Sequence, residues 1–319
     1  MMRKYKLGCH KRQINFSALI KIFLIVTACL NFSYALTKSG QKPSHQRRNK
    51  SNQSYNQAAR IEHLGFNVSD PNAVAEWYVQ NLGMKIIRKD NNSPFVTFIA
   101  DKGKHLIMEF YKKDKFPKID FNKINYMSFH FAFMVDSIEV SKSKLISNGA
   151  KVMEDISALP SGDKVLMMRD PWGMPLQLVK RVNPMLKFTN IRPEHFATNT
   201  TDSRAKAKWY ADNLGMDILR QGGLPDYGTF VADSGKDMML ELYQKKEFPF
   251  IDYNKINPVS IHLAFVVNNV GVYKKKLLNG GAKLVNDIPK SASGDKVLVM
   301  RDPWGFPIQL IQRAVPLLP

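Results

Sequence analysis

Eight side chains that could hold a metal ion or move a proton recur in this chain at a constant spacing of 132 residues. They are His63 and His195, Glu109 and Glu241, His130 and His262, and Gln177 and Gln309. Two imidazoles and a carboxylate suit Fe(II), Mn(II), Zn(II) or Ni(II), and a glutamine can add a neutral oxygen. A lone histidine in a strand is more often structural than a ligand. Two histidines in equivalent strands, together with a glutamate of the same sheet, favour a metal site instead.

The recurring residues lie in two copies of one sequence unit. The first copy runs from about Arg60 to Arg181 and the second from about Arg192 to Arg313, with no insertion between matching positions. Each copy divides again into two similar halves, and each half has the order strand, helix, strand, strand, strand. A half of this size cannot bury a sheet face alone, so the halves must pair to form a core. The predicted fold class is α+β, with four βαβββ modules, two per domain.

The first half shows which elements must position the candidate residues. An alternating strand over residues 63–68 precedes a helix over about residues 72–82. Ser69 or Asp70 is suited to cap the start of this helix, and Gly83 its end. Short strands are expected near residues 85–88, 95–100 and 106–111. The other halves repeat this order, so each candidate residue falls on a strand.

Period-two alternation assigns the side chains of these strands to two faces. One face of the first strand carries His63, Gly65 and Asn67, and the other carries Leu64, Phe66 and Val68. We expect the bulky apolar set to pack under the helices. The histidine set then faces the opposite side, which is the concave side if the sheet curls.

A second recurring motif lies near the end of each copy. Met168 to Arg181 returns as Met300 to Arg313, and both contain Arg-Asp-Pro-Trp-Gly. Proline presets φ in such a turn and glycine takes the position with positive φ, so a tight turn before a strand is expected. Gln177 and Gln309 fall in the strand that follows.

These features resemble the vicinal oxygen chelate superfamily, which includes glyoxalase I, the type I extradiol dioxygenases and the bleomycin-resistance proteins. The resemblance rests on the paired βαβββ modules, the histidine in the first strand of each module, Asn-Leu-Gly-Met after the first helix, and the Arg-Asp-Pro-x-Gly-x-Pro motif. It covers essentially all of residues 60–313. It implies that two modules form a U-shaped, curled sheet around a cleft, where the first and last strands of each module direct ligands at one divalent metal ion.

Carried onto this sequence, the resemblance implies one ligand set in each copy. The first is His63, Glu109, His130 and Gln177, and the second is His195, Glu241, His262 and Gln309. The final position is most often glutamate in the family. Glutamine cannot carry a proton, so Glu109 or Glu241 would have to act as the catalytic base.

Further side chains are candidates for substrate binding. Tyr111 and Tyr243 share a strand face with the two glutamates, and Asn67 and Asn199 share one with the first-strand histidines. Arg169 and Arg301 could clamp an anionic substrate, although an ion pair with Asp170 or Asp302 is the favoured role. The aromatic and lysine-rich segments 112–125 and 244–257 could cover the cleft as lids or serve as plain connections.

The charge of the chain is concentrated at its N-terminus. The net charge of the whole chain is +20. The first sixty residues contribute +12 of it, with twelve Lys or Arg and no Asp or Glu, and residues 61–319 contribute the other +8, with 35 basic and 27 acidic residues. The high pI therefore does not indicate nucleic-acid binding by the folded part. Both cysteines, Cys9 and Cys29, also lie in this leader, so the folded part has neither a disulfide nor a thiol nucleophile.

The leader has the layout of a secretory signal peptide. Basic residues precede a short apolar run over residues 22–30, and Ser33-Tyr34-Ala35 follows as a small-residue cleavage site. Cys29 would be the lipid-modified residue if the leader were instead of the lipoprotein type, and an uncleaved anchor is a third interpretation. We expect an exported protein, periplasmic or extracellular, whose only membrane attachment would be through the N-terminus. The predicted divisions are a signal peptide (1–35), a disordered basic tether (36–59), domain one (60–182), a linker (183–190) and domain two (191–314).

The sequence thus predicts an exported, metal-dependent enzyme acting on a small substrate with adjacent oxygens, with one divalent ion in each domain. Glyoxalase-like lyase or isomerase chemistry is the nearest activity that the resemblance implies. An Fe(II) extradiol-type dioxygenase is one alternative. A non-catalytic protein of the bleomycin-resistance type, which sequesters a small molecule, is the other. The oligomeric state is not predicted.

Overall fold

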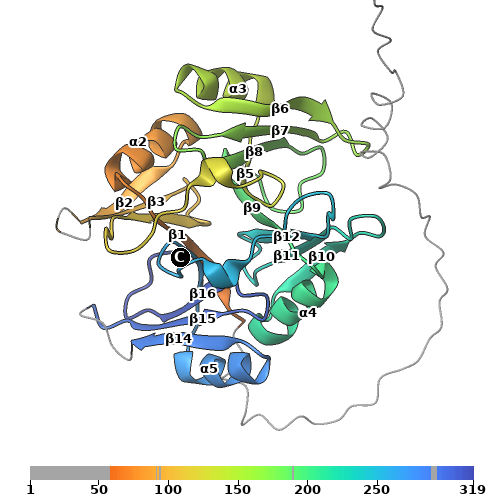
Figure 1. Cartoon of the computed structure of the whole chain (residues 1–319). Helices are drawn as coiled ribbons and strands as arrows, with labels where there is room; N and C mark the ends of the chain where they lie inside the picture. The colour runs from red at the N-terminus through yellow and green to blue at the C-terminus, as the bar shows by residue number, and fades with distance from the viewer. Residues whose placement is uncertain (1–57, 91, 93–94, 189, 289–292) are drawn as a thin grey trace, which may run out of the picture.

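The structure is a computed structural model, and it describes residues 58–90, 92, 95–188, 190–288 and 293–319 (Figure 1). The predicted signal peptide, including Cys29, and residues 36–57 of the predicted tether lie outside these residues. The last residue of the predicted tether, Ala59, belongs to the folded part instead, because it is buried and its N–H donates to the carbonyl of Leu214. Within them, no helix is long and apolar enough to cross a membrane.

The first copy folds into two βαβββ modules. Module 1 consists of β1 (Arg60–Asn67), α2 (Pro71–Leu82), β2 (Lys85–Lys89), β3 (Val96–Ala100) and β4 (Ile107–Tyr111). Module 2 consists of β5 (Phe129–Met134), α3 (Ile138–Ser147), β6 (Lys151–Ala158), β7 (Lys164–Arg169) and β8 (Pro175–Lys180). A short 3₁₀ turn, Phe121–Lys123, lies in the connection between them.

The second copy repeats this arrangement. Module 3 consists of β9 (Arg192–Asn199), α4 (Ser203–Leu214), β10 (Asp217–Gln221), β11 (Thr229–Ala232) and β12 (Met239–Tyr243). Module 4 consists of β13 (Ile261–Val266), α5 (Val270–Asn279), β14 (Lys283–Ile288), β15 (Lys296–Arg301) and β16 (Pro307–Gln312). The corresponding 3₁₀ turn is Tyr253–Lys255.

Local signals in the sequence set the ends of these elements. The Asp70 carboxylate caps α2 by accepting hydrogen bonds from the backbone N–H groups of Asn72 and Ala73, and Gly83 ends the helix with φ +67°. In the Asp-Pro-Trp-Gly turn, the N–H of Gly173 donates to the carbonyl of Asp170, and Gly173 has φ +88°. The predicted caps and turns are therefore confirmed.

The four modules form two eight-stranded sheets, and each sheet joins modules from different copies (Figure 1). Sheet A has the order β14-β15-β16-β13-β1-β4-β3-β2, and sheet B has the order β10-β11-β12-β9-β5-β8-β7-β6. The first strand of each module forms the seam, with β1 antiparallel to β13 and β5 antiparallel to β9. Module 1 thus pairs with module 4, and module 2 with module 3.

This pairing corrects the expectation that each copy holds its own ligand set. Within a copy, the modules meet through their helices instead of through their sheets. The indole N–H of Trp77 on α2 donates to the carbonyl of Asn148 at the end of α3, and Trp209 donates to Gly280 in the same way. The helical faces of the two modules pack against each other within a copy. The free edge of each first strand then pairs with the first strand of a module from the other copy.

The predicted division of the strands into two faces is confirmed. Leu64 and Phe66 of β1 and Met108 and Phe110 of β4 pack with the helices in one large apolar cluster. His63 and Glu109 lie on the opposite face, which we call the inner face of the sheet. A small separate cluster on the inner face of each sheet is built around Phe98 in sheet A and around Phe230 in sheet B.

Candidate metal centres

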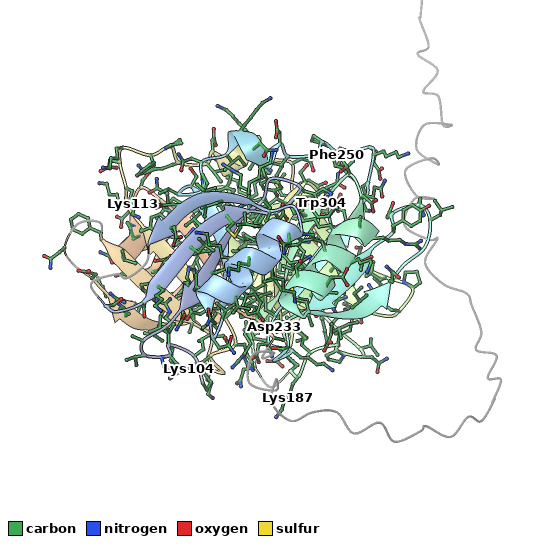
Figure 2. All side chains as sticks on the ribbon, turned by 90° about the horizontal axis from the view of Figure 1, so that it is seen from below. Lys104, Lys113, Lys187, Asp233, Phe250 and Trp304 are labelled. Carbon is green, nitrogen blue, oxygen red and sulfur yellow. The ribbon has the colours of Figure 1, made fainter. Side chains whose placement is uncertain are left out.

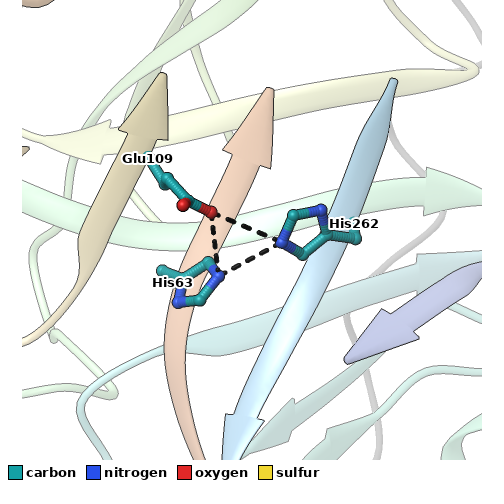
Figure 3. A group of neighbouring side chains, drawn as sticks. All are labelled: His63, Glu109 and His262. Atoms are coloured by element: carbon teal, nitrogen blue, oxygen red, sulfur yellow. Dashed lines mark hydrogen bonds and ion pairs between the residues drawn. The ribbon is translucent and has the colours of Figure 1, made fainter. Parts of the chain in front are cut away.

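Site A, formed by His63, Glu109 and His262, lies on the inner face of sheet A (Figure 3). The Nε2 atoms of the two histidines are 3.2 Å apart. The Oε2 atom of Glu109 lies 3.3 Å from Nε2 of His63 and 3.6 Å from Nε2 of His262. Two imidazoles and one carboxylate therefore converge on one point.

Site B, formed by His130, His195 and Glu241, has the same arrangement on sheet B. Its two Nε2 atoms are 3.4 Å apart. The Oε2 atom of Glu241 lies 3.1 Å from Nε2 of His195 and 3.7 Å from Nε2 of His130. All six predicted histidine and glutamate ligands are thus brought together, but in the sets His63–Glu109–His262 and His130–His195–Glu241.

Strand register explains this convergence and also places the two glutamines. In sheet B, Glu241 and His130 lie on either side of Ala197 in one row across the strands, and His195 and Gln177 lie on either side of Ala132 in the next row. Gln177 is thus the counterpart of Glu241 on the opposite side of the seam, and Gln309 has the equivalent position beside Ala264 in sheet A. The amide of Gln177 also contacts Sδ of Met167 at 3.4 Å.

A buried carboxylate supports the first-strand histidine of each site. An Oε2 atom of Glu62 lies 2.9 Å from Nδ1 of His63, and the equivalent distance from Glu194 to His195 is 2.8 Å. The register of each first strand shifts at this glutamate, and the resulting bulge brings it to its neighbouring histidine. Sequence reasoning missed these residues, although Glu-His recurs at 62–63 and 194–195.

An arginine at the end of each copy completes this support. Arg313 donates to both oxygens of Glu62 at 2.8 and 2.5 Å, and Arg181 donates to both oxygens of Glu194 at 2.8 and 2.7 Å. The bidentate contact holds the carboxylate in place. Each arginine comes from the module on the far side of the seam, so this network also depends on the pairing across copies.

The second histidine of each site is packed against a tyrosine. The ring of Tyr111 stacks on His262 with centroids 6.1 Å apart, and its hydroxyl donates to the carbonyl of Val259. Tyr243 stacks on His130 at 6.3 Å and donates to the carbonyl of Met127. Both predicted tyrosines therefore border the sites and fix the orientation of a ligand ring.

Family comparisons agree with this architecture. A family model of the Glyoxalase/Bleomycin resistance protein/Dioxygenase superfamily matches residues 60–178, and a model of a glyoxalase-like domain matches residues 195–311. The chain belongs to the vicinal oxygen chelate superfamily. The predicted family and fold class are confirmed.

Individual members of the superfamily show the same relationship. A lactoylglutathione lyase from Arabidopsis thaliana is 22% identical over 271 residues, which cover 79% of this chain and 91% of the relative. Glyoxalase I from Zea mays has a TM-score of 0.66 at 20% identity, covering 80% of this chain and 92% of that one. A putative dioxygenase from Bacillus subtilis has a TM-score of 0.58 at 11% identity, covering 81% and 86%. At these identities the solved structures establish the fold alone.

The ligand atoms of each site fit a divalent transition-metal ion, as the resemblance to the superfamily implies. Two imidazole nitrogens and one carboxylate oxygen suit Fe(II), Mn(II), Zn(II) and Ni(II). The hydrogen bond between Nδ1 of His63 and Glu62 leaves Nε2 available as a ligand atom, which is the usual arrangement behind a metal-binding histidine. The histidines are almost fully buried, while 16% of the Glu109 side chain and 21% of the Glu241 side chain stay exposed. Solvent therefore reaches each centre at its glutamate.

The electrostatics of site A favour a cation at the point of convergence. Burial lowers the pKa of His63, but hydrogen bonds and charges from Glu109 and Glu62 outweigh it and raise the pKa to about 9. Burial raises the pKa of Glu109, but contact with His262 and His63 outweighs burial and holds this pKa well below its ordinary value. Burial and the charge of His63 lower the pKa of His262. At neutral pH, Glu109 is therefore ionised, His262 is neutral and His63 carries a proton, which a metal ion would have to displace from Nε2.

Two predicted substrate-binding pairs have other roles. The amide nitrogen of Asn67 donates to three carbonyls of the segment after β4, at Lys113, Phe116 and Pro117. Asn199 holds the segment after β12 by equivalent bonds to Lys245 and Phe248. These residues anchor the segments that could have served as lids, and their amides are fully engaged in doing so.

Arg169 and Arg301, which were predicted as a substrate clamp, contact the backbone. The guanidinium of Arg169 donates to the carbonyls of Phe121, Gly173 and Ile124, and that of Arg301 to the carbonyls of Tyr253, Gly305 and Ile256. Each guanidinium joins the Asp-Pro-Trp-Gly turn to the 3₁₀ turn. Both terminal nitrogens of each guanidinium are thus engaged by backbone carbonyls.

Proposed function

We propose that this chain is a divalent-metal-dependent lyase or isomerase that acts on a small substrate with two adjacent oxygens, at one site on each sheet. The observation that carries the proposal is the duplicated set of two histidines and one glutamate, each with a buried carboxylate behind its first histidine. A structural role for these histidines would not require that the three ligand atoms of each set lie within 4.8 Å of one another.

The chemistry that the ion supplies is polarisation of the substrate's adjacent oxygens, which stabilises negative charge that develops on them. The residues of the chain then divide the remaining work. Glu62 and Glu194 orient the first histidines, and Tyr111 and Tyr243 orient the second.

Proton transfer falls to the glutamate of each site. The Oε2 atom of Glu109 faces the histidines, while its Oε1 atom has no hydrogen-bond partner within the described part of the chain. Partial exposure lets a substrate proton reach this carboxylate. Contact with His262 and His63 keeps it ionised against the effect of burial, although a carboxylate whose pKa is lowered is a weaker base. Gln309 and Gln177 contribute a neutral oxygen and no proton transfer. We therefore assign the catalytic base to Glu109 in site A and Glu241 in site B.

The full-length protein, reconstituted with Fe(II), Mn(II), Zn(II) or Ni(II) and dialysed, should contain close to two ions per chain. Glu109→Ala and Glu241→Ala should each remove one ion, and the double variant both. The loaded protein would then be assayed with hemithioacetals of small 2-oxoaldehydes, the substrate class suggested by the lactoylglutathione lyases. Failure to retain any ion would overturn the enzyme proposal and leave a protein that binds small molecules without turnover.

A second candidate is an Fe(II)-dependent dioxygenase, because two histidines and one carboxylate are also the donor set of non-haem Fe(II) oxygenases. Oxygen consumption by the Fe(II)-loaded protein with catechols distinguishes the two functions. Uptake of O₂ with ring cleavage would select the dioxygenase, and isomerisation without O₂ uptake would select the lyase or isomerase.

We also propose that the protein is exported, on the basis of the layout of residues 1–35 alone. Cell fractionation with N-terminal sequencing tests this. A mature protein beginning near residue 36 outside the cytoplasm would support cleavage, and a lipid-modified Cys29 would identify the lipoprotein form. An intact N-terminus in the cytoplasmic fraction would contradict export.

A further inference from the structure

Beside each metal centre, an arginine lies over the aromatic ring next to the site glutamate. In sheet A, Phe98 of β3 is paired in register with Glu109 of β4 on one side and with Arg88 of β2 on the other. The Arg88 guanidinium carbon lies 5.3 Å from the centre of the Phe98 ring, and that ring contacts the edge of His63 at 6.4 Å. Phe98 therefore lies between Arg88 and the residues of site A.

Sheet B repeats this row. Phe230 of β11 is paired with Glu241 and with Arg220, and the Arg220 guanidinium carbon lies 4.4 Å from the ring centre. The Phe230 ring in turn contacts His195 at 5.8 Å. Both phenylalanines belong to the inner-face clusters, which separates this row from the helical face of the sheet.

Arg88 and Arg220 differ from the other arginines that the structure describes. Arg181 and Arg313 hold the buried glutamates, Arg169 and Arg301 hold backbone carbonyls, and Arg60, Arg192 and Arg204 each make at least one hydrogen bond. Within the described residues, Arg88 and Arg220 alone have neither a hydrogen bond nor an ion pair. Both are exposed, at the edge strand of their sheet.

The contact with the phenylalanine ring holds each guanidinium in position without engaging its N–H groups in hydrogen bonds. A cation over an aromatic ring is held by the ring face, so all five N–H groups stay available for another partner. The planar donor fork of arginine matches a carboxylate in a bidentate contact. A single residue in register, Phe98 or Phe230, separates the guanidinium from the site glutamate. Because that ring is itself buried, a molecule that contacts both the arginine and the metal centre must lie across the ring.

We propose that Arg88 and Arg220 bind a carboxylate at the far end of the substrate, so that the substrates of this protein are small acids bearing two adjacent oxygens. This inference rests on the proposed metal-dependent function and specifies the substrate class of the same sites. Arg88 and Arg220 act in binding and specificity and take no part in proton transfer.

Two matched hydroxamates provide the test. The hydroxamate head offers two adjacent oxygens to the metal, and the tail is either uncharged, as in butyrohydroxamic acid, or ends in a carboxylate, as in succinic acid monohydroxamate. A longer pair, with four methylenes in place of two, covers a greater span. Dissociation constants would be measured by calorimetry on full-length protein loaded with Ni(II) or Zn(II). We expect at least one acid to bind about fivefold more tightly than its uncharged partner.

The preference should disappear in the double variant Arg88→Gln and Arg220→Gln, while binding of the uncharged hydroxamates and the metal content stay unchanged. Lys275→Gln, which removes an exposed charge on helix α5, should leave the preference intact. Equal binding of acid and uncharged forms to the unaltered protein would overturn the inference, as would a preference that survives the double variant. Loss of all hydroxamate binding together with absence of metal would instead overturn the proposed function, and this inference with it.

Discussion

His63 from the first copy and His262 from the second lie with their Nε2 atoms 3.2 Å apart, although 199 residues separate them in the chain. His130, which belongs to the same copy as His63, contributes to the other centre. Each site is therefore shared between copies, and neither copy contains a full ligand set of its own.

The number of metal ions bound per chain can distinguish ligand sets that are shared between copies from sets that each lie within one copy. The double variant His63→Ala and His262→Ala removes two ligands of site A and should still retain one ion per chain in site B. The double variant His63→Ala and His130→Ala removes one ligand from each site and should weaken both. Elemental analysis after dialysis gives the answer. The reverse pattern, with one ion retained only in the His63 and His130 variant, would contradict the sharing.

Gly65 leaves the space that the His262 ring occupies. A Cβ atom added at Gly65 would lie 2.2 Å from Cε1 and 2.5 Å from Nε2 of His262, so Gly65→Ala must displace this ring. We expect metal affinity at site A to fall by about tenfold or more, comparable to the loss of a supporting contact. Titration with a metal-sensitive dye measures the change.

The equivalent position in the second copy provides the control. Ala197 already carries a methyl group opposite His130, so Ala197→Gly removes a group without creating a collision. Site B should keep its affinity in this variant. A loss at site A that is no larger than the change at site B would show that the ring at His262 can move without consequence.

The segments that follow β8 and β16 close corresponding regions of the two sheets. Leu317 and Leu318 pack against Phe98 and its neighbours in sheet A, while Met185 and Leu186 pack against Phe230 in sheet B. Figure 2 shows Lys187 of the linker on the edge of the molecule opposite Lys113 and Phe250, which lie in the segments after β4 and β12.

Deletion of residues 314–319 should therefore affect site A and spare site B. Loss of two partly buried leucines should lower the free energy of unfolding by about 2 kcal/mol, measured by urea denaturation. Metal affinity should fall at site A, because Phe98 contacts His63. The double variant Met185→Ala and Leu186→Ala should have the converse effect, so a deletion that weakens both sites equally would contradict the assignment.

Substitution by asparagine should have opposite effects on protein stability at Asp170 and at Asp302. Both accept a hydrogen bond from a buried tyrosine, Tyr78 or Tyr210, but Lys206 lies 3.2 Å from Asp302, whereas the matching residue near Asp170 is Val74. Burial raises the pKa of Asp170 to about 6, against the hydrogen bonds that lower it. The ionised form of Asp170 is thus disfavoured in the folded protein.

The sign of the pH dependence follows from this raised pKa. The unfolded carboxyl ionises near pH 3.8, so the contribution of Asp170 to stability is present below that pH and is lost as the pH rises to about 6. Two pH units correspond to about 3 kcal/mol. Asp170→Asn should remove this dependence and stabilise the protein at pH 7, as measured by denaturation at several pH values.

The same change at Asp302 should destabilise the protein by about 3–5 kcal/mol, because it leaves the charge of Lys206 buried without its partner. Adding Lys206→Val to Asp302→Asn should restore most of that loss. Equal effects of the two asparagine substitutions at pH 7 would show that Lys206 does not determine the difference.

Local sequence determined the modules, their helix caps and turns, and the strand face on which each candidate residue lies. Asp70, Gly83 and the Asp-Pro-Trp-Gly turns act within a few residues of the chain, and alternation along β1 separates His63 from Leu64 irrespective of the strand's partner. The recurrence of histidine, glutamate and glutamine at a spacing of 132 residues therefore sufficed to name the six histidine and glutamate residues of the two candidate sites.

Only the tertiary structure decided which modules share a sheet. All four modules offer similar first strands, so pairing within a copy and pairing between copies satisfy the same alternation and bury the same faces. Packing of α2 against α3 and of α4 against α5 uses the helical faces within each copy, and β1 then joins β13 across the seam. The roles of Glu62 and Arg313 follow from that seam. Both residues recur 132 residues away, as Glu194 and Arg181, but the recurrence does not show that a strand bulge and a contact over 251 residues bring them together.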